Sequence, residues 1–272
     1  MLKHLVTSGC SFSDNCTGRL RWPHFLAQAL NVKLYNRGQG SAGNAWISKS
    51  AIYNTQQLLE QGVNVDEILV VVCWSGIDRK DLFVSETTPK FKNIINSNNH
   101  QGNPVNFVDT EINKMIVSDK TDGYLLGNAR CTFDNANINT FKQELIKEYY
   151  CDEALAIESY ENFLRLQWYC ESKKIKLINT TFMDIMHYPY YKNKYYPDVP
   201  LSKITYSRNI APLYNMIDFN KWVFWKETGG IYEYVADNDL SFNTPGYFHP
   251  SIESYGLWVN NYLLPEMLKR GI

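Results

Sequence analysis

The run Glu67-Ile68-Leu69-Val70-Val71-Val72-Cys73-Trp74 gives the clearest indication of how this chain folds. Beyond its first residue the run carries no charged side chain, and β-branched residues are its most frequent type. A continuous apolar strand of this kind is typical of a parallel sheet, because helices cover both faces of such a sheet. We therefore predict a buried central strand at 67–74 in an α/β protein.

The segments before this strand alternate between strand and helix patterns. Residues 2–8 predict a first strand and 32–36 a short second one, while helical spacing of apolar residues predicts helices at 21–31 and 44–61. Strand, helix, strand, helix, strand with short connections is the order of a doubly wound fold. The prediction is a three-layer α/β/α, flavodoxin-like fold, with a parallel sheet of about five strands and helices on both faces.

The rest of the chain is predicted to complete the sheet after a long insertion. Residues 84–139 lose periodicity and are rich in Asn, Thr, Lys and Gly, which indicates an insertion after the third strand. Helical spacing returns at 140–173, and the next strand is expected at 175–181. A late strand or extended segment is predicted at 231–235, and a last helix at 251–269.

The composition is that of an ordinary globular protein, and it limits the possible partners. The 272 residues fit one domain, 1–272, with 44% apolar and 20% charged residues. The net charge of −1 gives no electrostatic footprint for nucleic acid or for an anionic membrane. We therefore expect neither nucleic acid nor a membrane as a partner.

No segment has the pattern of an export signal or a membrane span. The N-terminus lacks the apolar stretch of ~7–15 residues of a signal peptide, and no run approaches the ~18 apolar residues of a membrane helix. The six cysteines have no CxxC spacing and are expected to be reduced thiols. No metal-ligand pattern occurs, so neither a metal nor a cofactor is expected. The predicted location is cytoplasmic, or within a particle assembled without secretion.

Four segments with small or reactive residues follow the predicted strands or precede the last helix. Ser11 follows the first strand, Gly40 lies in the turn after the second, Asp78 follows the third, and His249 comes just before the last helix. The carboxyl ends of parallel strands meet at one edge of a sheet, where open α/β folds bind their ligands. We expect these four segments to meet at that edge.

In their order these segments resemble the motifs of the SGNH (GDSL-like) hydrolase superfamily. That family has Gly-Asp-Ser after strand one, Gly after strand two, Gly-x-Asn-Asp after strand three and Asp-x-x-His before the last helix. Here the blocks read Gly9-Cys10-Ser11, Gly40, Gly76-Ile77-Asp78-Arg79 and Gly246-Tyr247-Phe248-His249. The resemblance covers roughly residues 2–80 and 175–270.

The resemblance implies a serine hydrolase in which Ser11 is the nucleophile and His249 its general base. A serine hydroxyl attacks an ester only when a neighbouring base accepts its proton, and a neutral imidazole does this near neutral pH. By the same resemblance the oxyanion is held by the backbone N–H groups of Ser11 and Gly40 and by the side chain at position 78. Glycine suits position 40 because no Cβ blocks the approach of a substrate.

Three positions depart from the family pattern. Cys10 replaces the aspartate of the first block, and Asp78 replaces the asparagine of the third. An ionised carboxylate repels an oxyanion, so Asp78 is either protonated in a dry site or structural, and Ser75 or Asn44 is another candidate donor. The acid expected three residues before the histidine is Gly246.

The acid that would orient His249 therefore has to come from another position. Asp237 and Asp239 are the nearest acidic residues in sequence, and a backbone carbonyl is a further possibility. A triad acid orients the base without taking the proton itself, so a Ser–His dyad is a workable alternative.

The predicted function is an esterase or deacylase that cleaves an O-acyl ester of a small molecule or glycan through an acyl-serine. Five tyrosines would either line a sugar-binding face or form a packed lid over the sheet: Tyr188, Tyr190, Tyr191, Tyr195 and Tyr196. The alternative is a catalytically silent module that keeps the SGNH fold within a larger assembly.

Overall fold

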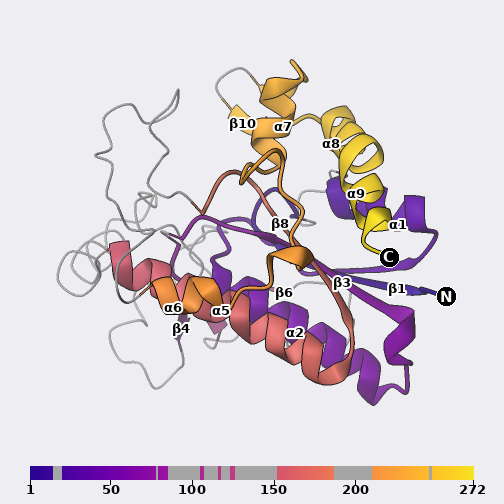
Figure 1. Ribbon diagram of the computed structural model, residues 1–272, viewed down its shortest axis with the longest axis vertical. Helices are drawn as coiled ribbons and strands as arrows, with labels where there is room; N and C mark the ends of the chain where they lie inside the picture. The colour runs from indigo at the N-terminus through magenta and orange to yellow at the C-terminus, as the bar shows by residue number, and fades with distance from the viewer. Residues whose placement is uncertain are drawn as a thin grey trace.

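The computed structural model describes nine stretches of the chain. They are 1–14, 20–77, 79–84, 105–106, 116–117, 123–125, 152–186, 210–244 and 247–272. Figure 1 shows the arrangement of their helices and strands.

A four-stranded parallel sheet forms the centre of the described structure. Its strand order is β2 (Lys33–Asn36), β1 (His4–Gly9), β3 (Ile68–Trp74) and β8 (Lys176–Thr181). All three pairings are parallel, so the carboxyl ends of the strands share one edge. The fold class is thus the predicted α/β, with four parallel strands described where about five were expected.

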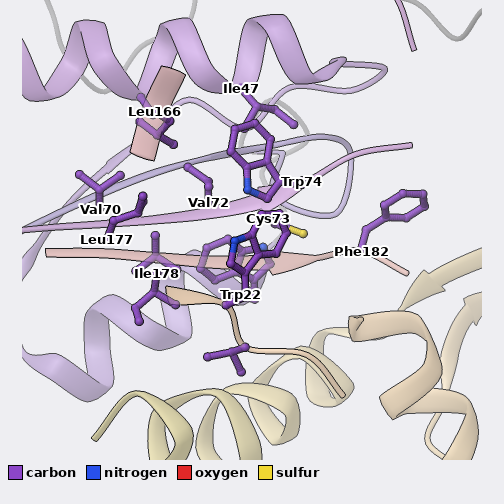
Figure 2. Close-up of a cluster of buried hydrophobic side chains, with 14 of the residues drawn as sticks. Trp22, Ile47, Val70, Val72, Cys73, Trp74, Leu166, Leu177, Ile178 and Phe182 are labelled. Atoms are coloured by element: carbon purple, nitrogen blue, oxygen red, sulfur yellow. The ribbon is translucent and has the colours of Figure 1, made fainter. Parts of the chain in front are cut away.

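Helices cover both faces of this sheet and make the fold three-layered. On one face α2 (Asn44–Glu60) packs against α5 (Asp152–Lys173). On the other face α1 (Trp22–Leu30) packs against α8 (Ile252–Trp258) and the π-helix η5 (Val259–Leu263), which α9 (Leu264–Lys269) continues. Figure 2 shows strands of the sheet between helices on either side. Among the described residues no helix combines the length and apolar composition needed to cross a membrane.

The core lies on both sides of β3, as the apolar run at 67–74 predicts. Every residue of this strand is buried, which confirms the predicted central strand. Trp22 packs under one face and Ile47 of α2 over the other (Figure 2), and both are fully buried. Burial of such side chains contributes about 1.5–3 kcal/mol each to folding.

The segment predicted as a late strand at 231–235 is a helix, α7 (Ile231–Asp237), so that prediction was wrong. Its first turn is fixed by Glu233, whose carboxylate accepts hydrogen bonds from the backbone N–H groups of Gly230 (2.7 Å) and Asp184 (3.0 Å). A carboxylate that binds N–H groups at a helix start favours the helix. The β-branched and aromatic residues of this short segment pack equally well on a helix, and four of them are buried.

Among the described residues, two antiparallel units accompany the central sheet. The pair β9 (Phe242–Thr244) and β10 (Tyr247–Pro250) leads into α8 and carries His249. A second sheet has the order β4 (Leu82–Val84), β7 (Gly123–Leu125), β5 (Val105–Asn106) and β6 (Ile116–Val117). Most of the predicted insertion at 84–139 lies outside the described residues, so its extent stays a prediction.

Between β8 and α7 the described residues, 182–186 and 210–230, form short elements. They are α6 (Ala211–Asn215) and a 3₁₀ turn at Phe219–Lys221, and a comparable turn at Val65–Glu67 precedes β3.

Candidate active site

The structure brings Ser11 and His249 into direct contact. Ser11 lies in the turn that follows β1, and His249 lies on β10, just before α8. The Ser11 Oγ and the His249 Nε2 are 2.7 Å apart, within hydrogen-bond range. The two residues are 238 positions apart in the chain, so the contact is a product of the tertiary fold.

The turn that carries Ser11 is fixed by hydrogen bonds to Ser13. The Trp22 Nε1–H donates to the Ser13 Oγ (2.8 Å), and the Asn36 Nδ2–H donates to the Ser13 carbonyl oxygen (2.7 Å). These bonds tie the turn to the start of α1 and to the end of β2. The position of Ser11 is therefore set by neighbours on both sides.

Two glycines allow this close packing. A Cβ at Gly38 would lie 2.2 Å from the Ser13 carbonyl oxygen, and one at Gly9 would lie 2.2 Å from the Ser13 Oγ. At Gly38 the obstacle is backbone, which cannot move aside as a flexible side chain does. A side chain at this position would therefore displace the Ser11 turn.

His249 is positioned by the start of α8 and by the packing of its imidazole on an aromatic ring. The Ser251 Oγ caps α8 by accepting a hydrogen bond from the Ser254 backbone N–H (3.1 Å), and the Ser251 backbone N–H donates to the Ser241 carbonyl oxygen (3.0 Å). The imidazole packs on the ring of Phe12, with the ring centroids 4.8 Å apart. Ser11 and Phe12 are neighbours in sequence, so one turn contacts the histidine twice.

The surroundings of His249 favour its neutral form. Burial, and after it the positive charges of Arg21 and Arg79, together lower the pKa of the imidazole to about 4. At neutral pH the imidazole is therefore uncharged, which is the state that accepts a proton from a serine hydroxyl.

The predicted oxyanion positions are only partly described. The turn with Gly40 lies beside the end of β1, because the Gln39 backbone N–H donates to the Gly9 carbonyl oxygen (3.0 Å). A Cβ at Gly40 would lie 3.3 Å from the Asp14 Oδ2, which places an acidic side chain beside this turn. Asp78 lies outside the described residues, so its predicted role stays a prediction.

In the structure the Asn44 side chain connects neighbouring elements, and it does not have the role of oxyanion donor that the sequence suggested. Its Nδ2 group donates both hydrogens, to the Ser75 carbonyl oxygen (3.1 Å) and to the Ser159 Oγ (3.0 Å). Its Oδ1 accepts from the Ser75 backbone N–H (2.9 Å). Asn44 therefore joins the end of β3 to α2 and α5, and no N–H of its amide is left for an oxyanion. The Ser75 hydroxyl is buried and has no hydrogen-bond partner among the described residues, so Ser75 keeps its candidacy.

Neither aspartate proposed as the orienting acid supports His249. The Asp237 Oδ2 accepts from the Trp225 Nε1–H (2.7 Å) and pairs with the Lys226 Nζ (2.6 Å) at an exposed site. The Lys226 ammonium and the Trp225 N–H lower the pKa of the Asp237 carboxyl. Asp239 is exposed as well, and its backbone has a left-handed φ of 52°. Closeness in sequence was misleading because the last residue of α7 and the turn that follows the helix place these two carboxylates at exposed positions.

Sequence reasoning missed three contributors around the site. They are the Phe12 ring, the Arg21 guanidinium and Asp81, which begins α2 by accepting hydrogen bonds from the backbone N–H groups of Gly43 (2.8 Å) and Trp46 (2.7 Å). Burial raises the pKa of the Asp81 carboxyl to about 6, against the opposing effect of these two bonds. Phe12 could have been noticed as the residue next to Ser11. The roles of Arg21 and Asp81 depend on partners distant in sequence.

The described residues contain no group of three or more His, Cys, Asp or Glu side chains that could hold a metal ion. Cys10, Cys73 and Cys170 are buried free thiols.

Comparison with known proteins relates part of the chain to a family without an assigned activity. Residues 14–119 are similar to a family of unknown function, DUF6071. This span is less than half of the chain; it contains Gly40 but neither Ser11 nor His249. A search of curated proteins gives no match to this chain.

Proposed function

We propose that this protein is a serine esterase or deacylase that hydrolyses an O-acyl ester through an acyl-serine intermediate. The observation that carries the proposal is the 2.7 Å contact between the Ser11 Oγ and the His249 Nε2 at the carboxyl edge of a parallel sheet. The neutral state of the imidazole supports it, since a charged histidine would not accept the proton.

The reaction follows from these two groups. The Ser11 Oγ attacks the ester carbonyl while His249 Nε2 takes the hydroxyl proton, and a tetrahedral oxyanion forms. The oxyanion collapses, the bond to the alcohol oxygen breaks, and His249 returns the proton to the leaving alcohol. Water then attacks the acyl-serine with His249 again as base, which releases the carboxylic acid and restores Ser11. By the family resemblance, the backbone N–H groups of Ser11 and Gly40 bind the oxyanion.

A fluorophosphonate probe tests this proposal, because it labels serines that a neighbouring base activates. We expect labelling of the full chain, its loss in Ser11→Ala and a strong decrease in His249→Ala. Ser172→Ala is the matched control, since Ser172 is an exposed serine of α5. Hydrolysis of p-nitrophenyl acetate should follow the same order. Absence of both labelling and turnover in a folded protein would refute the proposal.

One observation favours the alternative of a catalytically silent module. The aspartates proposed as the triad acid lie at exposed positions, and the charges of Arg21 and Arg79 lower the pKa of His249. Both arginines oppose the imidazolium that forms during the reaction. For a silent module we expect folded protein without labelling. The five tyrosines predicted to form a sugar-binding face or a lid lie outside the described residues.

A further inference from the structure

The Phe12 side chain is the centre of an aromatic cluster beside the Ser11–His249 pair. Its ring is 1% exposed. Its centroid lies 4.8 Å from that of His249, 5.2 Å from that of Phe182 and 6.4 Å from that of Tyr255. Phe182 directly follows β8 (Figure 2). Ser11 follows β1, so both residues lie beyond the carboxyl ends of parallel strands. The cluster therefore links the catalytic pair to α8 and to the end of β8.

A guanidinium group lies over the ring of Tyr255, and another lies over the ring of Phe182. The Arg21 Cζ lies 5.5 Å from the centroid of the Tyr255 ring, and the Arg79 Cζ lies 5.7 Å from that of the Phe182 ring. Both distances are within the range of cation–π contacts. Two positive charges thus lie one ring away from Phe12, near the reacting pair.

The Arg21 guanidinium is buried, and an anion would compensate for the water that its charge has lost. Its side chain is 5% exposed, and its buried Nε and Nη1 have no hydrogen-bond partner among the described residues. Burial of a guanidinium is unfavourable unless acceptors or a negative charge compensate for the lost water. Arg79 is partly exposed and donates from Nη1 to the Ala42 carbonyl oxygen (3.2 Å), which holds it beside the turn of Gly40.

We infer that Arg21 and Arg79 form a subsite for an anionic group, a carboxylate or a phosphate, carried by the ester substrate. This inference rests on the proposed function, and it narrows the substrate class to esters that also carry a carboxylate or a phosphate group. A planar guanidinium matches the oxygens of carboxylates and phosphates, so arginine is suited to this recognition.

Such a substrate would bring a negative charge near His249, whose acid position in the family pattern is occupied by Gly246 in this chain. Arg21 and Arg79 are the charged groups that oppose protonation of His249, while Asp14 lies beside Gly40 and acts on Tyr255. A bound anion would offset the two positive charges and make the imidazole more basic only when substrate is present. The negative charge that the family takes from an aspartate would here come from the substrate.

Binding of two simple anions to the Ser11→Ala protein tests the subsite without any need for turnover. Succinate represents the carboxylate and inorganic phosphate the phosphate, and each is titrated by calorimetry at low salt. We expect at least one to bind, and binding to weaken about tenfold or more in Arg21→Gln and in Arg79→Gln. Arg165→Gln is the matched control, because Arg165 is an exposed arginine of α5. Comparison of the affinities for succinate and for phosphate shows whether the subsite prefers a carboxylate or a phosphate group.

The protonation of His249 provides a second measurement. A histidine NMR titration of the same protein should give a pKa that rises by about one unit or more on saturation with the anion. Arg21→Lys, with retained charge, tests the site if Arg21→Gln does not fold. Absence of binding by both anions, or equal binding by wild-type and Arg79→Gln proteins, would overturn the inference.

A pair of esters separates failure of this inference from failure of the proposed function. The enzyme should prefer mono-p-nitrophenyl succinate to p-nitrophenyl acetate, and Arg79→Gln should reduce that preference. Equal hydrolysis of both esters would refute the anion subsite and leave the esterase proposal standing. Anion binding without hydrolysis or probe labelling would refute the esterase and leave the subsite standing.

Discussion

The two residues of the Ser11–His249 pair are held in different ways. The Ser11 turn is fixed by backbone contacts and hydrogen bonds that converge on Ser13, with two glycines packed against it. His249 is held by a helix cap and by ring packing on Phe12, in a cationic environment. The position of Ser11 is therefore determined by steric fit, whereas the pKa of His249 depends on charges that a ligand can change.

The largest expected effect comes from a change on the serine side. Gly38→Ala places a Cβ against the Ser13 backbone and should reduce the free energy of unfolding by about 3 kcal/mol or more, with displacement of Ser11. Urea denaturation measures the loss. Gly40→Ala is the matched control, because among the described residues its Cβ would meet the Asp14 carboxylate alone, at 3.3 Å. Equal destabilisation by the two substitutions would show that contact with Ser13 does not fix this turn.

The histidine side is tested by the pH dependence of catalysis. The pKa of His249 is lowered to about 4, first by burial and then by Arg21 and Arg79. For p-nitrophenyl acetate, which carries no anionic group, kcat/KM should therefore decrease only below about pH 5 and not near the ordinary histidine value of about 6.5. Arg79→Gln should move this acidic limb to higher pH. An acidic limb near 6.5 in the wild-type protein would contradict a cationic, buried setting for the base.

Asp81 binds the backbone at the start of α2, directly after the loop with Gly40. Its contribution to the free energy of unfolding should vary with pH. Burial raises the pKa of the Asp81 carboxyl from 3.8 to about 6 in the folded protein. Between these two values the folded state binds more protons than the unfolded state, so the stability decreases as the pH rises. The total decrease from this group is at most about 3 kcal/mol between about pH 4 and 7. Urea denaturation across this range should show the decrease in wild type and its loss in Asp81→Asn.

The sequence predicted the framework of the fold better than the surroundings of its site. The predicted strand at 67–74 matches β3, and the helices predicted at 21–31 and 44–61 match α1 and α2 to within one or two residues. Burial on both faces and helical spacing are local patterns, so they can be read directly. The segment 231–235 was misread because a short apolar run suits a strand or a helix, and Gly230 and Glu233 together decide between them.

The same distinction applies to the candidate site. Ser11 and His249 each follow from a position, at the end of a strand and before a helix, and the structure places them in contact. The engagement of Asn44 with Ser75 and Ser159 depends on three separate elements. The burial of Arg21 against Tyr255 likewise depends on contacts far apart in sequence. Such partners have no local signature, so reasoning from sequence could not assign these side chains.

The smallest expected effect concerns the acid that the sequence suggested. Asp237 forms an exposed pair with Lys226 and a hydrogen bond with Trp225, and exposed pairs of this kind contribute about 0–1 kcal/mol. Asp237→Asn should therefore leave esterase activity within about twofold of wild type and change stability by less than about 1 kcal/mol. Steady-state kinetics and urea denaturation measure both. Loss of a triad acid decreases kcat by about 10⁴-fold. A decrease approaching that size would mean that Asp237 reaches His249 during the reaction, so that the histidine, like Ser11, would be held by a hydrogen-bonded partner.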